Sequence, residues 1–399
     1  MHFIFISTFL GPVGGIEVLI ARMSKWLLEK GHRVTLLTTT VRESRELFPK
    51  KMNFVELGDQ LSQLCFWHTS RKTWADLRVD RPDVIKTFDL TASWIASILS
   101  SQIRPAPKVL FGNYFPYLIP ESRNPLKFLT YRLFLLNLRR NFADDSIICM
   151  SEEQISDFRR HYGGNRNPNF WPLPVEDPSK TGPTRTPKWG RIVSVSRLAP
   201  MKEYNLYMID VVARLRQKGC PVTWTVYGEG EFAAAMMARI NALGLGEAIK
   251  LKGRLANSKF AEAMQHAYVF VGMGTSAIEA AMCGVPTIVA LAYDTTGLTY
   301  GPLYRFNFGN VGERMDARPT TTVEAEIKRV LVLPKAEYER EMQRTREYAK
   351  CYEVDGTMEQ FLEIVGKASA PKACYALFYW YYIHSLAERL RQKVKAATC

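Results

Sequence analysis

The stretch that decides the fold runs Val269-Phe-Val-Gly-Met-Gly-Thr-Ser-Ala-Ile-Glu-Ala-Ala-Met-Cys-Gly-Val-Pro-Thr-Ile-Val289. It predicts a short apolar strand, a Gly-Met-Gly turn, a helix that begins at Thr275 or Ser276, and a second strand after Gly284 and Pro286. Strand, helix and strand in this order form a crossover unit. The stretch therefore predicts a parallel sheet covered by helices.

The same turn has the features of a ligand site. Gly272 and Gly274 let the backbone come close to a ligand, and the N-terminus of a helix offers unpaired N–H groups. We expect Glu279 in the first turn of this helix, where its carboxylate can accept hydrogen bonds from the two vicinal hydroxyls of a ribose. An ordinary crossover, in which Glu279 is only a surface residue matched to the helix dipole, is the alternative.

A second segment adds positive charge. The predicted strand Arg191-Ile-Val-Ser-Val-Ser196 leads into the loop Arg197-Leu-Ala-Pro-Met-Lys202, and a helix is expected from Glu203 to Lys218. A guanidinium and an ammonium group five residues apart can hold a diphosphate between them. Two further predicted strands, in 222–231 and 249–255, also end in glycine loops. Ligands of open parallel sheets bind at the carboxyl ends of the strands, so we expect these ends to form one pocket.

These motifs, taken in order, resemble the family-four retaining glycosyltransferases of GT-B fold. The motifs are Ser-Arg-Leu-x-x-x-Lys, Tyr-Gly-Glu-Gly, Lys-Gly-Arg and Gly-x-Gly-Thr-Ser-x-x-Glu-Ala. At the N-terminus, Gly14-Gly-Ile-Glu17 and Gly31-His-Arg-Val-Thr-Leu-Leu-Thr38 are similar to the first domain of that family. The resemblance extends over about residues 1–360 and implies two Rossmann-like doubly wound α/β domains that face a cleft.

The resemblance implies a role for each motif in binding a nucleotide-diphosphate sugar. Glu279 is expected on the ribose, and Arg197 and Lys202 on the diphosphate, as the catalytic residues. The donor-binding set is Gly14, Gly15, Gly228, Glu229, Gly253, Gly272, Gly274, Thr275 and Ser276. The family implies front-side attack with retention, in which the leaving phosphate can take the acceptor proton. No metal or other cofactor is expected, because the two cations can neutralise the diphosphate.

The chain departs from the family pattern at two places. The first of two glutamates usually found eight positions apart falls on Val271, so we expect a different contact with the donor sugar, through the backbone of 272–275. Asn113 and Tyr114 stand where a first-domain loop often carries histidine. Asp89, Asn113 and Tyr114 are our candidate acceptor residues. Asp89 could equally cap the helix that follows it.

Composition fits a protein with two domains and an anionic partner. The chain has 399 residues, 47% of them hydrophobic, and a net charge of +14, which favours nucleotide-sugar phosphates or anionic lipid. No nucleic-acid-binding motif is evident. The seven cysteines lack metal spacing and indicate a reducing compartment. The apolar start, 3–10, is expected to be a core strand and not a signal peptide, and no transmembrane helix is predicted.

We expect an N-terminal acceptor domain over 1–175, a linker over 176–189 and a nucleotide-sugar domain over 190–345. A crossover helix over 346–366 would return to the first domain. In the last segment, 367–399, four cations follow an aromatic run, and the segment is expected to lie on an anionic membrane surface, although docking on the chain itself is the alternative. The helix expected over 125–141 is equally consistent with a core helix and a membrane face.

The resemblance therefore implies a metal-independent retaining hexosyltransferase, and the basic aromatic tail indicates that its acceptor is a glycan or a lipid-linked glycan. We expect it in the cytoplasm, peripheral on the inner face of the bacterial cell membrane, in polysaccharide or lipopolysaccharide synthesis. A nucleotide-sugar epimerase of the same fold is one alternative. Another is a catalytically silent nucleotide-sugar-binding partner of a glycan-assembly complex.

Overall fold

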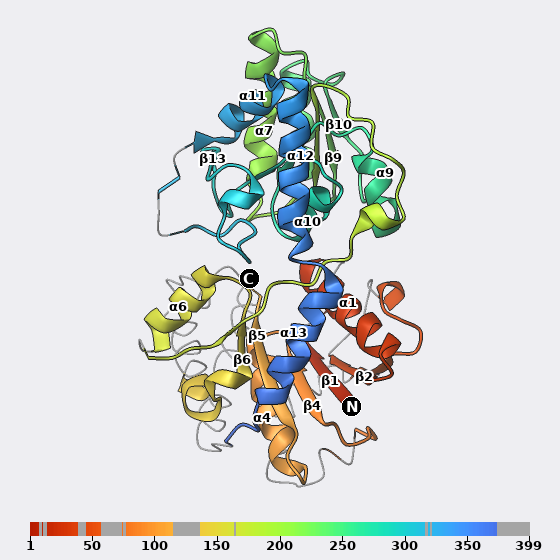
Figure 1. Ribbon diagram of the computed structural model, residues 1–399, viewed down its shortest axis with the longest axis vertical. Coiled ribbons are helices and arrows are strands. Elements are labelled where there is room, and N and C mark those ends of the chain that lie inside the picture. Colours follow the sequence, from red (N-terminus) through yellow and green to blue (C-terminus); the bar gives the residue numbers. More distant parts are fainter. Residues whose placement is uncertain are drawn as a thin grey trace, which may run out of the picture. The chain divides into compact units, whose positions relative to one another are not determined.

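The computed structural model describes residues 1–7, 10, 14–38, 45–56, 74, 77–114, 136–162, 165–315, 318–319 and 321–372. The chain divides into two units (Figure 1). Met1–Trp171 and Met358–Cys399 make up the first unit, and Pro172–Thr357 make up the second. Each unit is built around its own parallel sheet with helices on its faces. This is the doubly wound α/β class that the sequence predicts.

The first unit contains a seven-stranded sheet in the order β3-β2-β1-β4-β5-β6-β7. All neighbouring strands in it run parallel. The order reverses between β1 and β4, so the carboxyl ends of these two strands lie at a topological switch point, where ligands bind in such sheets. The strands are β1 (His2–Ser7), β2 (Arg33–Thr38), β3 (Asn53–Glu56), β4 (Val84–Thr87), β5 (Lys108–Asn113), β6 (Ile147–Cys149) and β7 (Asn169–Phe170).

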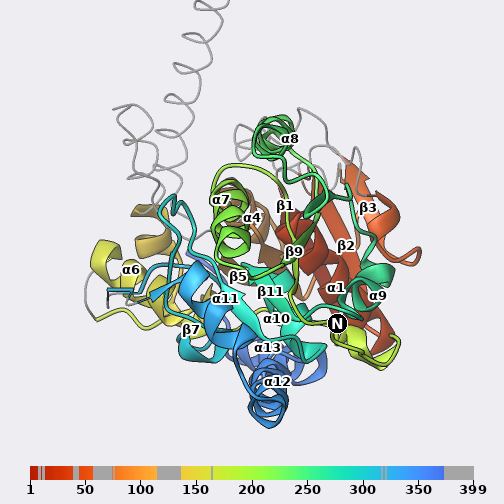
Figure 2. The ribbon, with the colours of Figure 1, turned by 90° about the horizontal axis from the view of Figure 1, so that it is seen from above.

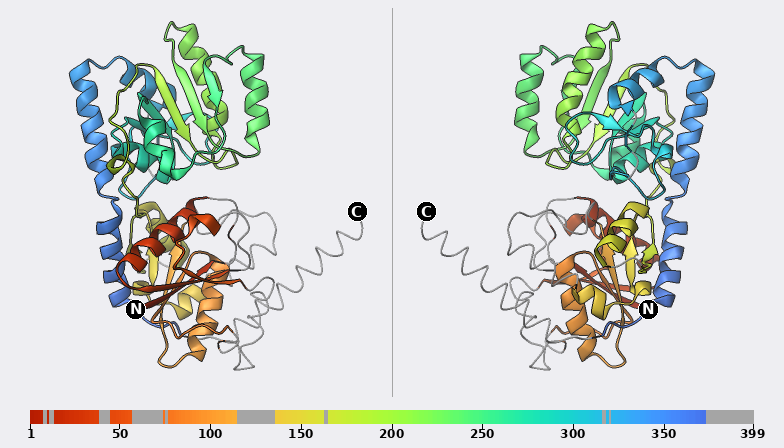
Figure 3. Two further views of the ribbon diagram at one scale, coloured as in Figure 1. Left: turned by 90° about the vertical axis from the view of Figure 1, so that its right-hand side faces the viewer. Right: turned by 90° about the vertical axis from the view of Figure 1, so that its left-hand side faces the viewer.

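Helices cover both faces of this sheet (Figure 3). Alternate residues of β1 pack in opposite directions: Ile4 and Ile6 join the cluster that contains α4, whereas the Phe3 ring lies 6.3 Å from that of Phe361 in α13. Burial of both faces explains why the strands are almost continuously apolar. The helices are α1 (Gly15–Glu29), α4 (Leu90–Gln102), α6 (Glu152–Tyr162) and α13 (Val354–Lys367).

The second unit contains a five-stranded parallel sheet in the order β10-β9-β8-β11-β12. Its switch point lies between β8 and β11, the strands that precede the two motifs richest in candidate site residues. The strands are β8 (Arg191–Val195), β9 (Thr223–Tyr227), β10 (Ile249–Leu251), β11 (Val269–Gly272) and β12 (Thr287–Val289). In a separate two-stranded sheet, β13 (Leu298–Thr299) pairs antiparallel with β14 (Thr321–Thr322).

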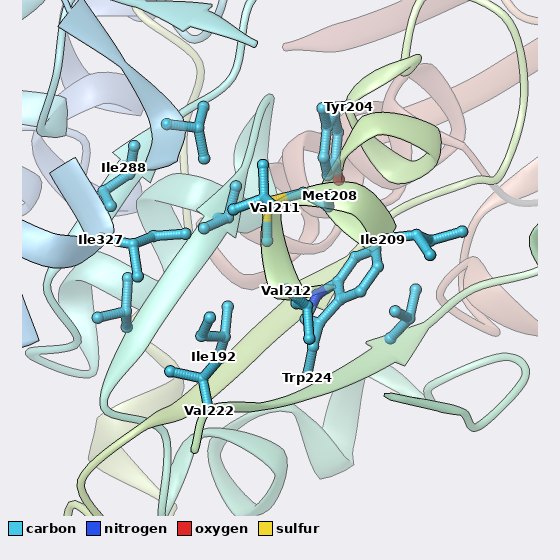
Figure 4. Packing of buried hydrophobic residues seen from close by; sticks show 14 of the residues in the cluster. Ile192, Tyr204, Met208, Ile209, Val211, Val212, Val222, Trp224, Ile288 and Ile327 are labelled. Carbon is cyan, nitrogen blue, oxygen red and sulfur yellow. The ribbon is translucent and has the colours of Figure 1, made fainter. Parts of the chain in front are cut away.

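Two apolar clusters hold the helices of the second unit on opposite faces of its sheet. Helices α7, α8 and α11 contribute to one cluster and α9 and α10 to the other, while α12 contributes Tyr338 to the first and Ala349 to the second (Figure 2). Figure 4 shows the first cluster, in which Trp224 packs beneath α7. The helices are α7 (Tyr204–Gln217), α8 (Phe232–Ala242), α9 (Phe260–Met264), α10 (Thr275–Met282), α11 (Val323–Leu331) and α12 (Lys335–Lys350).

The boundaries between the two units lie close to the domain boundaries expected from the sequence, but do not coincide with them. The stretch 176–189, expected as a linker, belongs to the second unit and includes a short 3-10 helix at Pro178–Lys180. Two helices, α12 and α13, occupy the region where a single crossover helix over 346–366 was expected. The expected membrane segments lie largely outside the described residues, which include only 136–141 of the first and 367–372 of the second.

Candidate functional site

The loop after β8 places two cations at the carboxyl edge of the second sheet. The Arg197 side chain is exposed and that of Lys202 is partly buried. Burial, and then the positive charge of Arg197, lower the pKa of Lys202 from its ordinary 10.5 to about 8. The two cations therefore lie close enough to repel each other. An anion between them would relieve both the repulsion and the loss of hydration.

The shape of this loop is fixed from within the second unit. The Asn205 side-chain amide donates to the Ser196 hydroxyl (3.1 Å) and to the Lys202 carbonyl (2.9 Å). Met201 adopts a left-handed conformation with φ of 80°, which is rare for a residue with a side chain. Its carbonyl accepts the Tyr293 N–H at 3.2 Å, which ties the loop after β8 to the loop after β12. The backbone strain at Met201 therefore lies beside Lys202, as is common at functional sites.

The N-terminus of α10 lies beside the same loop. The Ser276 hydroxyl donates to the carbonyl oxygen of Val195 at 2.8 Å, two residues before Arg197. The Ser276 hydroxyl is thus occupied as a donor, so the donor that Ser276 offers a ligand is its backbone N–H, which, like that of Thr275, has no intrahelical acceptor. The N-terminus of α10 thus lies beside the end of the strand whose loop carries the two cations, a combination suited to phosphate.

Gly274 shapes the start of this helix. Its φ of 76° favours glycine, and no atom lies within 4 Å of the position that a Cβ would occupy. Its N–H is already used, because it donates to the Val311 carbonyl at 2.7 Å. The Glu313 carboxylate in turn accepts the Val311 N–H at 2.9 Å. Segment 310–313, which sequence reasoning missed, therefore holds the Gly-Met-Gly turn in place.

Glu279 lies in the second turn of α10, and not in the first as expected, because the helix begins at Thr275. The side chain is partly exposed, whereas its neighbours Ile278 and Ala280 are fully buried. The stabilisation of a carboxylate by the helix dipole falls off within the first turn. The position of Glu279 therefore weakens the interpretation as a dipole-matched surface residue, and its expected contact with ribose hydroxyls stays a prediction.

The glycine loops after β9 and β10 have a structural role. A Cβ on Gly228 would collide with the Ser196 carbonyl oxygen, and the Gly228 N–H donates to the Gly253 carbonyl at 2.7 Å. The Glu229 carboxylate accepts the Arg254 N–H at 3.3 Å. These residues join three neighbouring strand ends by direct backbone contact. Their expected role at the nucleotide base stays a prediction.

Val271 lies in the core and not at the surface of the site. It is fully buried in β11, and its carbonyl accepts the Ser194 hydroxyl at 2.7 Å. A side chain at this position points into the cluster under α7 and cannot reach a ligand at the carboxyl edge. A sugar contact at this end of the unit has to come from other groups, such as the exposed part of the turn that follows.

The candidate residues of the first unit lie at the start of helices or at strand ends. The Glu17 carboxylate accepts the Gly14 N–H at 3.0 Å, which caps α1 just before Gly15. Asp89 caps α4 by accepting the Ala92 N–H at 2.8 Å, so the capping alternative describes its position. Asn113 ends β5, although its side chain is outside the described structure, and Tyr114 follows it.

Two observations are limited to the described part of the chain. No helix there is both long and apolar enough to cross a bilayer. No group of three or more histidine, cysteine or acidic side chains there comes together in a way that could hold a metal ion. The expectation of a reaction without metal stays a prediction.

The sequence matches two family models, Glycosyltransferase Family 4 over residues 13–177 and Glycosyl transferases group 1 over residues 183–297. No curated protein matches the chain. Among solved structures, HepE of Anabaena in complex with UDP and glucose is 17% identical with a TM-score of 0.64, over 91% of this chain and 99% of that one.

Two other solved structures share the fold. A variant of S. aureus TarM, in complex with Fondaparinux, alpha-GlcNAc-glycerol and UDP, is 10% identical with a TM-score of 0.61, over 91% of this chain and 99% of that one. The lipopolysaccharide outer core galactosyltransferase WaaB is 12% identical with a TM-score of 0.57, over 92% and 99%. At these low identities the solved structures show the fold alone. The two family models show the family, because one matches most of the first unit and the other matches much of the second. The chain therefore belongs to the group 1 glycosyltransferases and has the GT-B fold.

Proposed function

We propose that the chain is a retaining glycosyltransferase that moves a hexose from a nucleotide-diphosphate sugar to a glycan or lipid-linked acceptor. The observation that carries the proposal is the hydrogen bond from Ser276 to the Val195 carbonyl. It sets the N-terminus of α10 beside the loop that carries Arg197 and Lys202. Backbone N–H groups, a guanidinium and an ammonium group then face one diphosphate, with Glu279 on the ribose.

In this proposal the charges act mainly on the leaving group. As the glycosidic bond loosens, negative charge grows on the diphosphate, and preorganised donors stabilise that charge without further reorganisation. The acceptor hydroxyl attacks from the side that the diphosphate leaves, which gives retention. A phosphate oxygen takes the proton of the acceptor hydroxyl, so no side-chain base is required.

The positive charge of this site also supports a reaction without metal. Arg197 and Lys202 supply the neutralisation that a divalent cation supplies in other phosphate sites. We therefore expect transfer to persist in the presence of excess EDTA. A loss of activity that added Mg²⁺ restores would contradict this part of the proposal.

The acceptor is assigned to the first unit, with Tyr114 and Asp89 as the candidate contacts. The net charge of +14 supports action at an anionic surface, and we propose a peripheral position on the inner face of the bacterial cell membrane. The name of WaaB and the glycerol glycoside bound to TarM make a cell-surface polysaccharide or lipopolysaccharide the first acceptor class to test.

The first test is a thermal-shift panel of nucleotides and nucleotide sugars. Since a ligand that binds only the folded state stabilises it by mass action, the right donor will raise the melting temperature. UDP-hexoses come first, because HepE was solved with UDP and glucose. Transfer is then measured with the best donor, and NMR of the product gives the anomeric configuration. An inverted product would exclude retention.

The second test removes one cation. Arg197→Ala should cost about 2–4 kcal/mol of transition-state stabilisation, comparable with the loss of one oxyanion donor. Arg191, at the exposed start of β8, provides a matched control because it lies at the opposite end of the strand. Near-native turnover of Arg197→Ala, or an equal loss with Arg191→Ala, would remove Arg197 from the mechanism.

A further inference from the structure

A buried lysine lies near the carboxyl edge of the first sheet and has no role in the site described so far. Lys86, in β4, has no solvent-exposed surface. Its ammonium nitrogen donates to the carbonyl of Thr87 at 3.1 Å. The same nitrogen lies 5.2 Å from the centre of the Phe88 ring and 4.9 Å from that of Tyr114. Its surroundings are thus one carbonyl, two aromatic rings and the buried thiol of Cys149 in β6.

The neighbouring residues are arranged around this amine. The Tyr114 ring stacks on Phe88 with ring centres 5.7 Å apart and an interplanar angle of 25°. A Cβ on Gly112 would collide with the Lys86 amine and would stand 2.6 Å from the Tyr114 ring. Only glycine therefore leaves room for both side chains over β5. We term this group of four packed residues the Lys86 cluster: Lys86, Phe88, Gly112 and Tyr114.

This cluster is costly for folding. No carboxylate pairs with Lys86 within the described residues, and burial lowers the pKa of Lys86 well below its ordinary range. The Tyr114 hydroxyl is also buried, without a hydrogen-bond partner in the described structure. Unpaired buried polar groups destabilise a fold, and methionine would fill a similar volume without that cost. Packing alone therefore does not explain a lysine at this position.

The position of the Lys86 cluster in the sheet explains why a lysine is kept there. The cluster lies where β4 and β5 end, at the edge of a parallel sheet where ligands bind. Departures from the rules of good packing are expected at functional sites. A cation held over aromatic faces also restrains the orientation of the rings.

We propose that Lys86 is a positioning residue for the acceptor: it holds the Tyr114 ring on Phe88 at the end of β5, where that ring contacts the acceptor sugar. This inference rests on the proposed function, because it takes the acceptor to bind the first unit. Lys86 acts through Tyr114 and does not touch the substrate itself.

The test compares two lysine-to-methionine variants in the same sheet. Lys86→Met removes the buried amine. Lys108→Met is the control, because Lys108 begins β5 at the opposite edge and donates only to the carbonyls of Val365 (2.8 Å) and Gly366 (2.6 Å). The measurements are the melting temperature, the Kd for UDP, and kcat/KM with octyl glycosides of glucose, galactose and N-acetylglucosamine as acceptors.

We expect Lys86→Met to melt at or above the temperature of the parent chain and to bind UDP equally well, but to lose at least tenfold in kcat/KM for the acceptor. Lys108→Met should melt lower and keep its kcat/KM. Because Lys86 acts through Tyr114, the double variant Lys86→Met/Tyr114→Leu should transfer no worse than Tyr114→Leu alone. Multiplying losses would show that the two residues act independently and would overturn the proposal.

Failure of this inference differs from failure of the proposed function. If the parent chain neither binds UDP nor transfers sugar, the proposed function fails for a UDP-sugar donor. Binding of the octyl glycosides without donor is then the independent measurement, and it should weaken in Lys86→Met. A parent chain that binds no glycoside, equal binding by both chains, or a loss of transfer that follows a fall in melting temperature would each refute the role of Lys86.

Discussion

The lowered pKa of Lys202 predicts that nucleotide affinity depends on pH in an unusual range. In the unliganded chain this pKa is about 8, chiefly because of burial and secondarily because of Arg197. Lys202 is then about nine-tenths charged at pH 7 and about one-tenth charged at pH 9. A diphosphate beside the amine favours the charged form and raises its pKa again, so binding at higher pH requires uptake of a proton.

The magnitude follows from these fractions. If only the charged amine holds the diphosphate, the affinity for UDP should fall about tenfold between pH 7 and pH 9, or about 1.4 kcal/mol. At pH 8 binding should take up about half a proton per site. The UDP phosphates do not obscure this change, because a phosphate monoester has its second pKa near 6.

Isothermal titration calorimetry measures both quantities. Titrations at pH 7 and pH 9 give the affinities, and titrations at pH 8 in two buffers of different ionisation enthalpy give the proton uptake. Lys202→Arg is the control, because a guanidinium stays charged over the whole range. Its affinity should be flat with pH and its proton uptake absent. A parent chain with a flat profile, or an arginine variant that keeps the slope, would refute the reasoning.

Three further predictions concern the other candidate residues. Glu279→Gln should weaken the affinity for UDP roughly tenfold, since a neutral amide loses the charge-assisted bonds to ribose hydroxyls. Calorimetry measures this affinity, and an unchanged value would show that Glu279 is only a surface residue that does not contact the ribose. Val271→Glu should not improve transfer and should cost at least about 3 kcal/mol in urea unfolding, since it buries an uncompensated charge; a stable, more active variant would contradict this. Deleting residues 370–399 should release the protein from anionic vesicles in co-sedimentation and spare transfer to soluble acceptors; equal sedimentation of both chains would exclude the tail as the membrane contact.

Much of the fold follows from local pattern. The motif loops fall at strand ends as expected, and α7 runs from Tyr204 to Gln217, within one residue of the expected helix at each end. The proximity of Arg197 and Lys202 follows from their spacing on one short loop. Such features depend on short-range sequence, on glycine at turns and on apolar runs, which is why they could be predicted.

The features that could not be predicted depend on contacts between distant residues. The Ser276 hydroxyl is occupied by Val195, far away in sequence, so that only the backbone N–H remains for a ligand. Burial of Lys86 depends on a glycine in the next strand, and no motif marks either residue. The start of α10 at Thr275 was expected, but Glu279 is its fifth residue and therefore lies in the second turn, since one turn contains about 3.6 residues.

The two partly or fully buried lysines have a common thermodynamic consequence. In the folded chain the pKa values of Lys86 and Lys202 lie below the ordinary 10.5, so the unfolded chain binds more protons between the lowered pKa values and 10.5. Stability contributed by these positions therefore rises as the pH increases through that range, and below the lowered pKa of each lysine the charged amine destabilises its unit. For Lys202 the diphosphate of the proposed donor would remove this penalty, because it would offset the charge of the amine. For Lys86 the groups around the amine are a carbonyl, two aromatic rings and the Cys149 thiol, so the fold itself supplies no carboxylate to offset the penalty within the described residues. Each unit thus keeps a lysine that weakens it at the edge of the sheet where ligands bind, which is the expected arrangement when selection acts on binding and not on stability alone.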